Sequence, residues 1–183
     1  MKRLALLLAL ILLPCAARAD RAVDVGLGVI TVPDGALVQL GEKTDEGGTL
    51  AVIVPDRRMG RPFYDGITVA WSPDRLIAPD TDAEALTRAL LETSVADMAA
   101  LDVAVLGCEA GPIELDAAGG TAFLRYALEA DCSGLGYARP LTLYYARRVL
   151  CGEGGGTYSI VCSASTAEGL EALLGYLDRA GLT

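Results

Sequence analysis

The chain has 183 residues, of which 52% are hydrophobic and 21% charged, and its net charge at pH 7 is −9 with no histidine present. An acidic chain is not expected to wrap a nucleic acid or coat an anionic membrane, because both attract basic proteins. The absence of histidine excludes Ser-His-Asp and Cys-His catalysis and histidine-ligated metal sites within the chain.

The first 19 residues predict a secretory signal peptide. Two basic residues precede an apolar run at 4–13, and the Ala-Arg-Ala sequence at 17–19 fits the small-residue cleavage pattern, with the cut after Ala19. The run is too short for a comfortable transmembrane span. Cleavage leaves residues 20–183 as a single α+β domain of 164 residues, with 12 basic against 24 acidic side chains and a net charge of −12. We therefore predict a periplasmic or secreted protein with no stable membrane span after cleavage.

Four strands are predicted in the first half of the mature chain. Apolar residues at odd positions predict a first strand across 22–32, softened by Gly26 and Gly28. Apolar, β-branched runs predict three more, at 36–40, 50–54 and 67–71. Proline-aspartate pairs follow several of these runs and mark chain reversals, because proline fixes φ and aspartate hydrogen-bonds to its own backbone.

A helix follows these strands. Thr81 and Glu84 form a capping box, which predicts a helix from about Asp82 to Leu101. Its apolar side is expected to consist of Leu86, Leu90, Leu91, Val95 and Met98.

The second half predicts antiparallel strands and a closing helix. Strands are expected at 113–115, 121–130 and 141–150, and a last strand alternates through Tyr158, Ile160 and Cys162. Ser165 and Glu168 form a second capping box, and Gly181 is expected to end the helix in a left-handed conformation. The helix has a leucine stripe that must be buried, formed by Leu170, Leu173, Leu174 and Leu177.

Runs of strands separated by helices predict an α+β fold, with a largely antiparallel β-sheet packed by two helices. Apolar residues on both faces of several strands fit a helix on each face, an α/β/α sandwich. The alternative, with both helices on one face, remains open at this point.

The mature chain has four cysteines, and an even number in an exported chain predicts disulfide bonds among Cys108, Cys132, Cys151 and Cys162. Three pairings are possible, and proximity along the chain favours Cys108–Cys132 and Cys151–Cys162. However, if residues 151–156 form a hairpin loop, Cys162 lies opposite about Tyr145, too far from Cys151 for a bridge. The second bridge therefore requires a different register.

The clearest predicted interaction surface is a loop in which arginines stand beside aromatic residues, a combination enriched at protein interfaces. The residues are Arg57, Arg58, Arg61, Phe63 and Tyr64. The alternative interpretation is a basic patch that keeps an acidic domain soluble.

No catalytic, metal-binding or cofactor-binding motif is present. The glycine cluster at 152–156 leads into a strand and lacks the lysine of a phosphate-binding loop. Arg147 and Arg148 point to opposite faces of the predicted strand, and at least one is expected to pair with an acid or to extend past the sheet edge.

The element order resembles the PsbP-like α/β/α sandwich family. The resemblance is carried by TAFLRYALEA at 121–130, TLYYARRVL at 142–150 and GGTYSIVCSAS at 155–165, followed by the last helix. It implies a non-enzymatic scaffold that binds a partner. No residue here matches a metal or chloride site motif of that family, so the resemblance implies no metal or chloride ligand for this chain.

The sequence therefore predicts an exported, non-enzymatic binding or assembly factor whose partner is another protein. The rival hypothesis is a periplasmic hydrolase that uses paired carboxylates and arginines. A deep pocket in which two carboxylates with raised pKa values converge would favour the hydrolase. A third possibility is a structural accessory subunit with a large exposed apolar patch.

Overall fold

The computed structural model describes residues 20–56, 65–152 and 154–182. The predicted signal peptide at 1–19 lies outside the described residues. So does the predicted interaction loop of Arg57, Arg58, Arg61, Phe63 and Tyr64.

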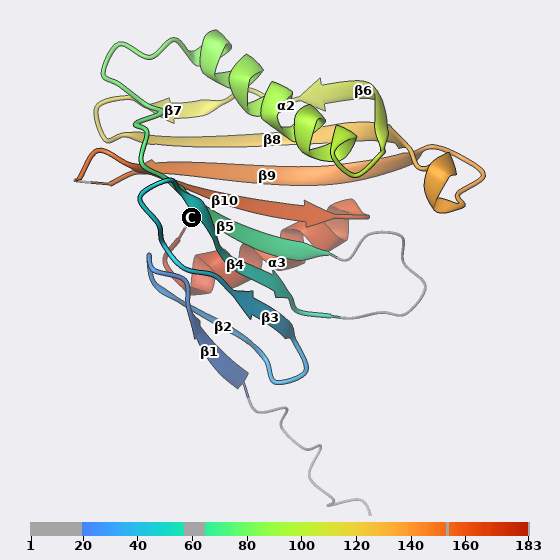
Figure 1. The fold of residues 1–183 in the computed structure, drawn as a ribbon, viewed down its shortest axis with the longest axis horizontal. Coiled ribbons are helices and arrows are strands. Elements are labelled where there is room, and N and C mark those ends of the chain that lie inside the picture. Colours follow the sequence, from blue (N-terminus) through green and yellow to red (C-terminus); the bar gives the residue numbers. More distant parts are fainter. Residues whose placement is uncertain (1–19, 57–64, 153, 183) are drawn as a thin grey trace, which may run out of the picture.

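Eight strands form one antiparallel sheet, which confirms the predicted fold class (Figure 1). The spatial order is β3-β4-β5-β10-β9-β8-β6, and the short strand β7 also pairs with β8. The strand bounds, in spatial order, are Leu37–Leu40 (β3), Gly48–Val54 (β4), Gly66–Ser72 (β5), Thr157–Ala164 (β10), Leu141–Cys151 (β9), Thr121–Asp131 (β8), Ala104–Ala110 (β6) and Glu114–Asp116 (β7).

The two main helices lie on opposite faces of this sheet, which settles the alternative left open by the sequence. Helix α2 (Ala83–Ala99) lies in front of the sheet over β8 and β9, and helix α3 (Ala167–Arg179) lies behind it (Figure 1). Each helix has its own cluster of buried residues, with the sheet between the two. No helix among the described residues has the length and apolar character needed to span a membrane.

The leucine stripe of α3 is buried as predicted. Leu170, Leu173, Leu174 and Leu177 pack against the strand residues Ile67, Val69, Ile160 and Cys162. Burying one leucine side chain stabilises a fold by about 1.5–3 kcal/mol, so the stripe is a large contribution to stability. Gly181 has a φ of +67°, which confirms the left-handed helix end.

The start of α3 lies one residue later than predicted. Thr166 is the N-cap, and its hydroxyl accepts a hydrogen bond from the Gly169 N–H at 3.0 Å. The predicted cap, Ser165, instead donates its backbone N–H and its hydroxyl to Asp65 Oδ1, at 2.9 and 3.0 Å. Ser is the better N-cap residue of the two, but Ser165 is engaged by Asp65, and Thr166 therefore takes the cap position.

The predicted strand at 22–32 is wrong, because this segment is a hairpin of β1 (Asp20–Asp24) and β2 (Val29–Pro33) in a separate two-stranded sheet. The chain reverses at Gly26, which has a φ of +78°, and its N–H bonds to Asp24 Oδ1 at 2.8 Å. The reversal moves burial from odd to even positions, so that Ile30 is buried and Val29 is exposed. The hairpin packs beside α3 on the same face of the main sheet.

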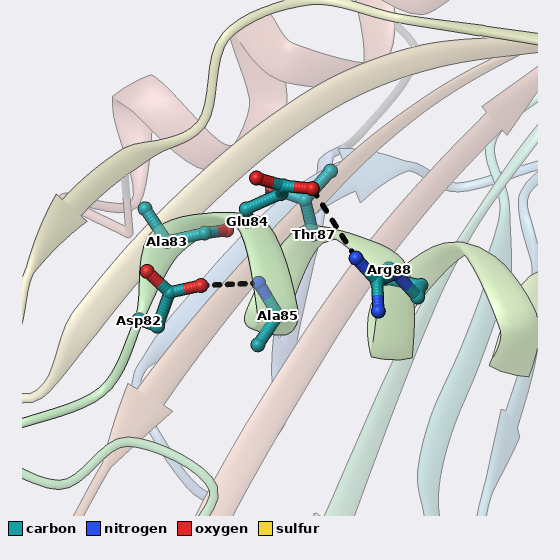
Figure 2. Close-up of polar contacts among 6 residues, drawn as sticks. All are labelled: Asp82, Ala83, Glu84, Ala85, Thr87 and Arg88. Carbon is teal, nitrogen blue, oxygen red and sulfur yellow. Dashed lines mark hydrogen bonds and ion pairs between the residues drawn. The ribbon is translucent and has the colours of Figure 1, made fainter.

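Helix α2 is capped by Asp82, whose carboxylate accepts from the Ala85 N–H at 2.8 Å (Figure 2). The predicted cap, Thr81, accepts from the Ala78 N–H at 2.7 Å and belongs to the preceding turn. The strand β6, which follows α2, was missed by the sequence analysis, and five of its seven residues are exposed.

The buried side of α2 differs from the predicted one at two positions. Leu86, Leu90 and Met98 are buried and Leu91 is half-buried, but Val95 is 38% exposed. Ser94 is buried in its place, and its hydroxyl lies 2.7 Å from the Tyr126 hydroxyl of β8.

The disulfides expected from the cysteine count are absent, and all four described cysteines are free. The strand register gives the reason. Cys108 lies opposite Leu128 of β8, and Cys132 follows four residues later, just after the end of β8; at about 3.4 Å per residue the separation exceeds the reach of a disulfide. Cys151 lies opposite Thr157, whereas Cys162 lies opposite Ala146, one residue from the position expected for a hairpin loop.

A pairing across the sheet is excluded by the same architecture. Cys162 belongs to the buried cluster beneath α3, whereas Cys132 and Cys151 belong to the cluster beneath α2. Burial raises the pKa of Cys162 to about 12, so this thiol is a poor nucleophile near neutral pH.

Candidate functional site: a pocket around Arg147

The sheet face that carries α2 is covered over only part of its width. Helix α2 lies over β8 and β9, and no described helix covers β10, β5, β4 or β3 on this face (Figure 1). We call this uncovered area the open half. Its central side chains are small or polar and half-buried: Thr68, Ala70, Ser72, Ser159, Val161 and Ser163.

A pocket of about 370 Å³ lies where the open half meets α2. Strands β5, β10 and β9 form its floor, and α2 supplies one wall through Ala89, Leu90 and Thr93. We call it the Arg147 pocket, because Arg147 on β9 is the only basic residue among the described residues that line it. Its volume is at the lower end of the range for ligand pockets, about 300–1,000 Å³.

The Arg147 guanidinium is half-buried and fixed in place. Its Nε donates to Ser159 Oγ at 3.0 Å, and its Nη1 donates to the Leu90 carbonyl oxygen at 3.1 Å. These two bonds use two of the five N–H donors of the group. Among the described residues, Arg147 has no carboxylate partner.

Arg147 lines the pocket, and its remaining N–H donors have no hydrogen-bond partner among the described residues. Within the described part of the chain, no buried side-chain nitrogen or oxygen lacks a hydrogen-bond partner. The Nη2 nitrogen has no partner there, so it must be reached by solvent. Next to it, the Ser159 hydroxyl accepts from Arg147 and keeps its own hydrogen available to donate.

One end of the pocket is closed by the segment after β5. The buried Thr157 hydroxyl donates to the Asp74 carbonyl oxygen at 2.7 Å and accepts from the Leu76 N–H at 2.9 Å. The Ser72 hydroxyl accepts from the Asp74 N–H at 3.2 Å. These bonds hold Leu76 and Asp74 at the rim, so the pocket has a fixed shape.

Behind Arg147, the Ser94–Tyr126 hydrogen bond anchors α2 to β8. Burial raises the pKa of Tyr126, against the lowering effects of the Ser94 hydrogen bond and the Arg147 charge. The phenol is therefore neutral at pH 7, and it does not serve as a counter-ion for the arginine.

Among the described residues, the lining of the pocket contains one basic side chain, Arg147, and one acidic side chain, Asp74. Asp74 is the only acid among the described residues that line it, whereas glycoside hydrolysis by the usual route needs two carboxylates. No group of three or more possible metal ligands occurs among the described residues. Elsewhere, hydrogen bonds from Ser133 lower the pKa of the exposed Asp131, the opposite of what a general acid needs.

The two neighbouring arginines point to opposite faces, as the strand period predicts. Arg148 lies on the α3 face with its guanidinium 5.8 Å from the Phe123 ring centroid. Neither arginine has an ion-pair partner among the described residues, so the expected pairing with an acid is not found there. The sequence had placed Arg147 on a face but gave no sign of its pocket, which depends on α2 and β10.

A second contact that the sequence analysis missed involves the only lysine of the predicted mature chain. Lys43 Nζ lies 3.4 Å from the Trp71 ring centroid and donates to the Tyr158 hydroxyl at 3.1 Å. A cation over an aromatic ring is stabilising, so the contact of Lys43 with Trp71 helps to hold the 41–47 segment against the sheet. The lysine is thus engaged within the chain.

No protein-family model matches the sequence, and no curated protein matches it. Solved structures do match. A solution structure of cyanobacterial PsbP (CyanoP) from Synechocystis sp. PCC 6803 has a TM-score of 0.48 at 12% identity, covering 92% of both chains. The crystal structure of the Saccharomyces cerevisiae Ran-binding protein Mog1p has a TM-score of 0.50 at 14% identity, covering 90% of this chain and 94% of that one. The chain has the PsbP-like fold that these proteins share.

Proposed function

We propose that this protein is an exported, non-enzymatic binding module that contacts a partner protein through the open half, with the Arg147 pocket receiving one group of the partner. The observation that carries the proposal is the pocket itself. It holds a half-buried guanidinium with donors that have no partner among the described residues, next to an uncovered sheet surface.

A charge at this depth favours a binding role. A half-buried cation without a counter-ion is partly desolvated without the compensation that an anion provides. The chain has 24 acidic residues, yet none of the described ones pairs with Arg147. An anionic group supplied by a partner would complete the site, because Arg binds planar anions with well-defined geometry.

The fold itself is compatible with this role. Mog1p, which has the same fold, is a Ran-binding protein. At 14% identity this likeness supplies neither a partner nor a contact surface for the present chain. It shows only that the fold can serve protein binding.

The hydrolase alternative lacks a supporting observation. A periplasmic hydrolase acting through paired carboxylates requires two acids in one pocket, and the described lining of the Arg147 pocket has Asp74 alone. Purified protein is expected to leave chromogenic glycoside and ester substrates unchanged. Turnover that is lost in Asp74→Asn would establish the hydrolase and contradict the binding role.

The binding role is tested by photo-cross-linking in the cells that export the protein. A photoreactive side chain replaces Gln39, which is exposed on the open half, or Ala172, which is exposed on α3 at the opposite face. We expect a protein adduct from the Gln39 position and none from Ala172. Cell fractionation in the same experiment locates the chain.

The adjacent arginine provides a matched control. Arg147→Met is expected to remove the Gln39 adduct, whereas Arg148→Met, one residue away on the opposite face, should leave it unchanged. Equal adducts from both faces, or an adduct that is insensitive to Arg147→Met, would show that the open half is not the binding surface.

A further inference from the structure

We propose that the ligand group of the Arg147 pocket is a single carboxylate carried on a small apolar body. This inference rests on the proposed function in using the same pocket, but it names the chemistry that the pocket recognises.

The donors of the pocket match one carboxylate. The free edge of the Arg147 guanidinium offers Nη2, and the Ser159 hydroxyl beside it offers a hydrogen. The Nε–H···Oγ bond of 3.0 Å fixes these two groups next to each other. A planar carboxylate has two oxygens that accept from two neighbouring donors, and bonds between ionised partners are about twice as strong as neutral ones.

A phosphate fits this site less well. Phosphate sites are commonly built from several backbone N–H groups at a helix N-terminus or a glycine-rich loop. The part of α2 that lines the pocket is the middle of the helix, at Ala89, Leu90 and Thr93, where the N–H groups are used within the helix. Asp74 at the rim adds a negative charge, which repels a dianion more than a monoanion.

The other lining residues of the pocket indicate which chemical group the carboxylate is attached to. Ala70, Leu76, Ala89 and Leu90 surround the polar groups with small or aliphatic surface. The volume of about 370 Å³ admits a group such as one terminal residue of a peptide or a short-chain acid. The pocket opens beside the open half, so a peptide that ends in it can continue across β10 and β5.

A structural role of Arg147 is present as well, because its bond to Leu90 ties α2 to β9. That role uses Nη1, and Ser159 takes the Nε–H, which leaves Nη2 without a partner among the described residues. A test must therefore separate ligand binding from helix docking.

The test follows the Arg147 Nε–Hε signal by NMR in the ¹⁵N-labelled full mature chain. It is titrated with acetyl-Ala-Ala-Val carrying a free carboxylate, with the same peptide as its C-terminal amide, with butyrate and with inorganic phosphate. We expect the free-acid peptide to shift this signal at saturation and to bind at least about tenfold more tightly than the amide and phosphate. The affinity should fall as salt rises, because the contact is between charges.

Two variants separate the roles. Ser159→Ala removes the second donor but keeps the arginine, and it should weaken free-acid binding about threefold to tenfold with no loss of the folded spectrum. Arg148→Lys, on the other face, should leave binding unchanged, whereas Arg147→Lys should weaken it at least tenfold.

The outcomes distinguish the carriers. Butyrate binding as tightly as the peptide supports the carboxylate and identifies a free acid as the ligand, which would contradict the partner-protein role and leave the carboxylate assignment intact. Tighter free-acid peptide binding assigns a chain terminus. Equal binding of acid and amide, or tighter binding of phosphate, overturns the inference even where the Gln39 cross-link is obtained.

Discussion

The α3 face of the sheet packs a leucine stripe onto isoleucine, valine and cysteine, whereas the α2 face places a serine–tyrosine hydrogen bond and an arginine where helix meets sheet. The hairpin β1–β2 extends the cover beside α3, and no described element does the same beside α2 (Figure 1). One face is therefore built for stability. On the α2 face, no described helix covers β10, β5, β4 or β3, and these strands form the open half.

The largest expected effect comes from the covered face. Leu173→Ala should lower the free energy of unfolding by about 3 kcal/mol, because it removes a side chain that is 3% exposed and leaves a cavity. Urea unfolding measures the change. Leu101→Ala, at a position 59% exposed, is the matched control and should change stability by less than about 0.5 kcal/mol. Similar losses at both positions would show that α3 does not pack as described.

The second prediction concerns alkaline pH. Burial raises the pKa of Cys162 from 9.0 to about 12, so the folded state holds the proton more tightly than the unfolded state. The stability associated with the neutral thiol is complete below pH 9 and is lost as the pH rises towards 12. Between pH 9 and 10.5 the loss is about 1.6 kcal/mol, because the slope rises from about 0.7 kcal/mol per pH unit at pH 9 towards about 1.4 at higher pH.

Cys162→Ala separates this thiol from the other alkaline titrations. The variant loses stability at every pH, but its slope between pH 9 and 10.5 should be smaller than that of the parent chain. Burial also raises the pKa values of Tyr126 and Tyr145, and these leave a residual slope of the same sign. An unchanged slope in Cys162→Ala would contradict the buried position of this thiol.

The covered face was also the easier one to predict from the sequence. The four leucines at helical spacing and the alternation in β10 both report burial directly, and each was correctly placed. The hairpin β1–β2 was not predicted, because the alternating pattern was interpreted as one strand across Gly26 and Gly28. In the structure the chain reverses at these glycines. A local pattern indicates which residues are apolar, but a turn decides which of them share a face.

The candidate site could not have been found in the same way. Arg147, Ser159 and Leu90 are 12 to 69 residues apart and meet only because β9 pairs with β10 and α2 crosses above them. The disulfide prediction failed for a related reason. An even number of cysteines carries no information about the distances between them in the fold. Register pairs Cys108 with Leu128, four residues before Cys132, which follows the end of β8.

The third prediction tests the boundary of the α2 face. Ser94→Ala should cost about 1.5 kcal/mol, because it removes the described partner of the Tyr126 hydroxyl and leaves that group in a buried position. Adding Tyr126→Phe removes the hydroxyl that Ser94→Ala leaves without its partner. The double variant should therefore be more stable than the sum of the two single losses implies. Strictly additive losses would show that the two hydroxyls do not interact.

The smallest effects concern the first turn of α2, where two polar contacts of similar length differ in kind (Figure 2). Asp82→Ala removes the cap on the Ala85 N–H and should cost about 1 kcal/mol, since that donor has no partner within the helix. Arg88→Ala removes an exposed ion pair with Glu84 at 3.2 Å and should cost less than about 0.5 kcal/mol, because water solvates both charges. Thermal unfolding of the two variants at low and high salt measures the difference. The Arg88 effect should vanish in high salt while most of the Asp82 effect persists, and the reverse order would mean that charge, and not capping, fixes where α2 begins.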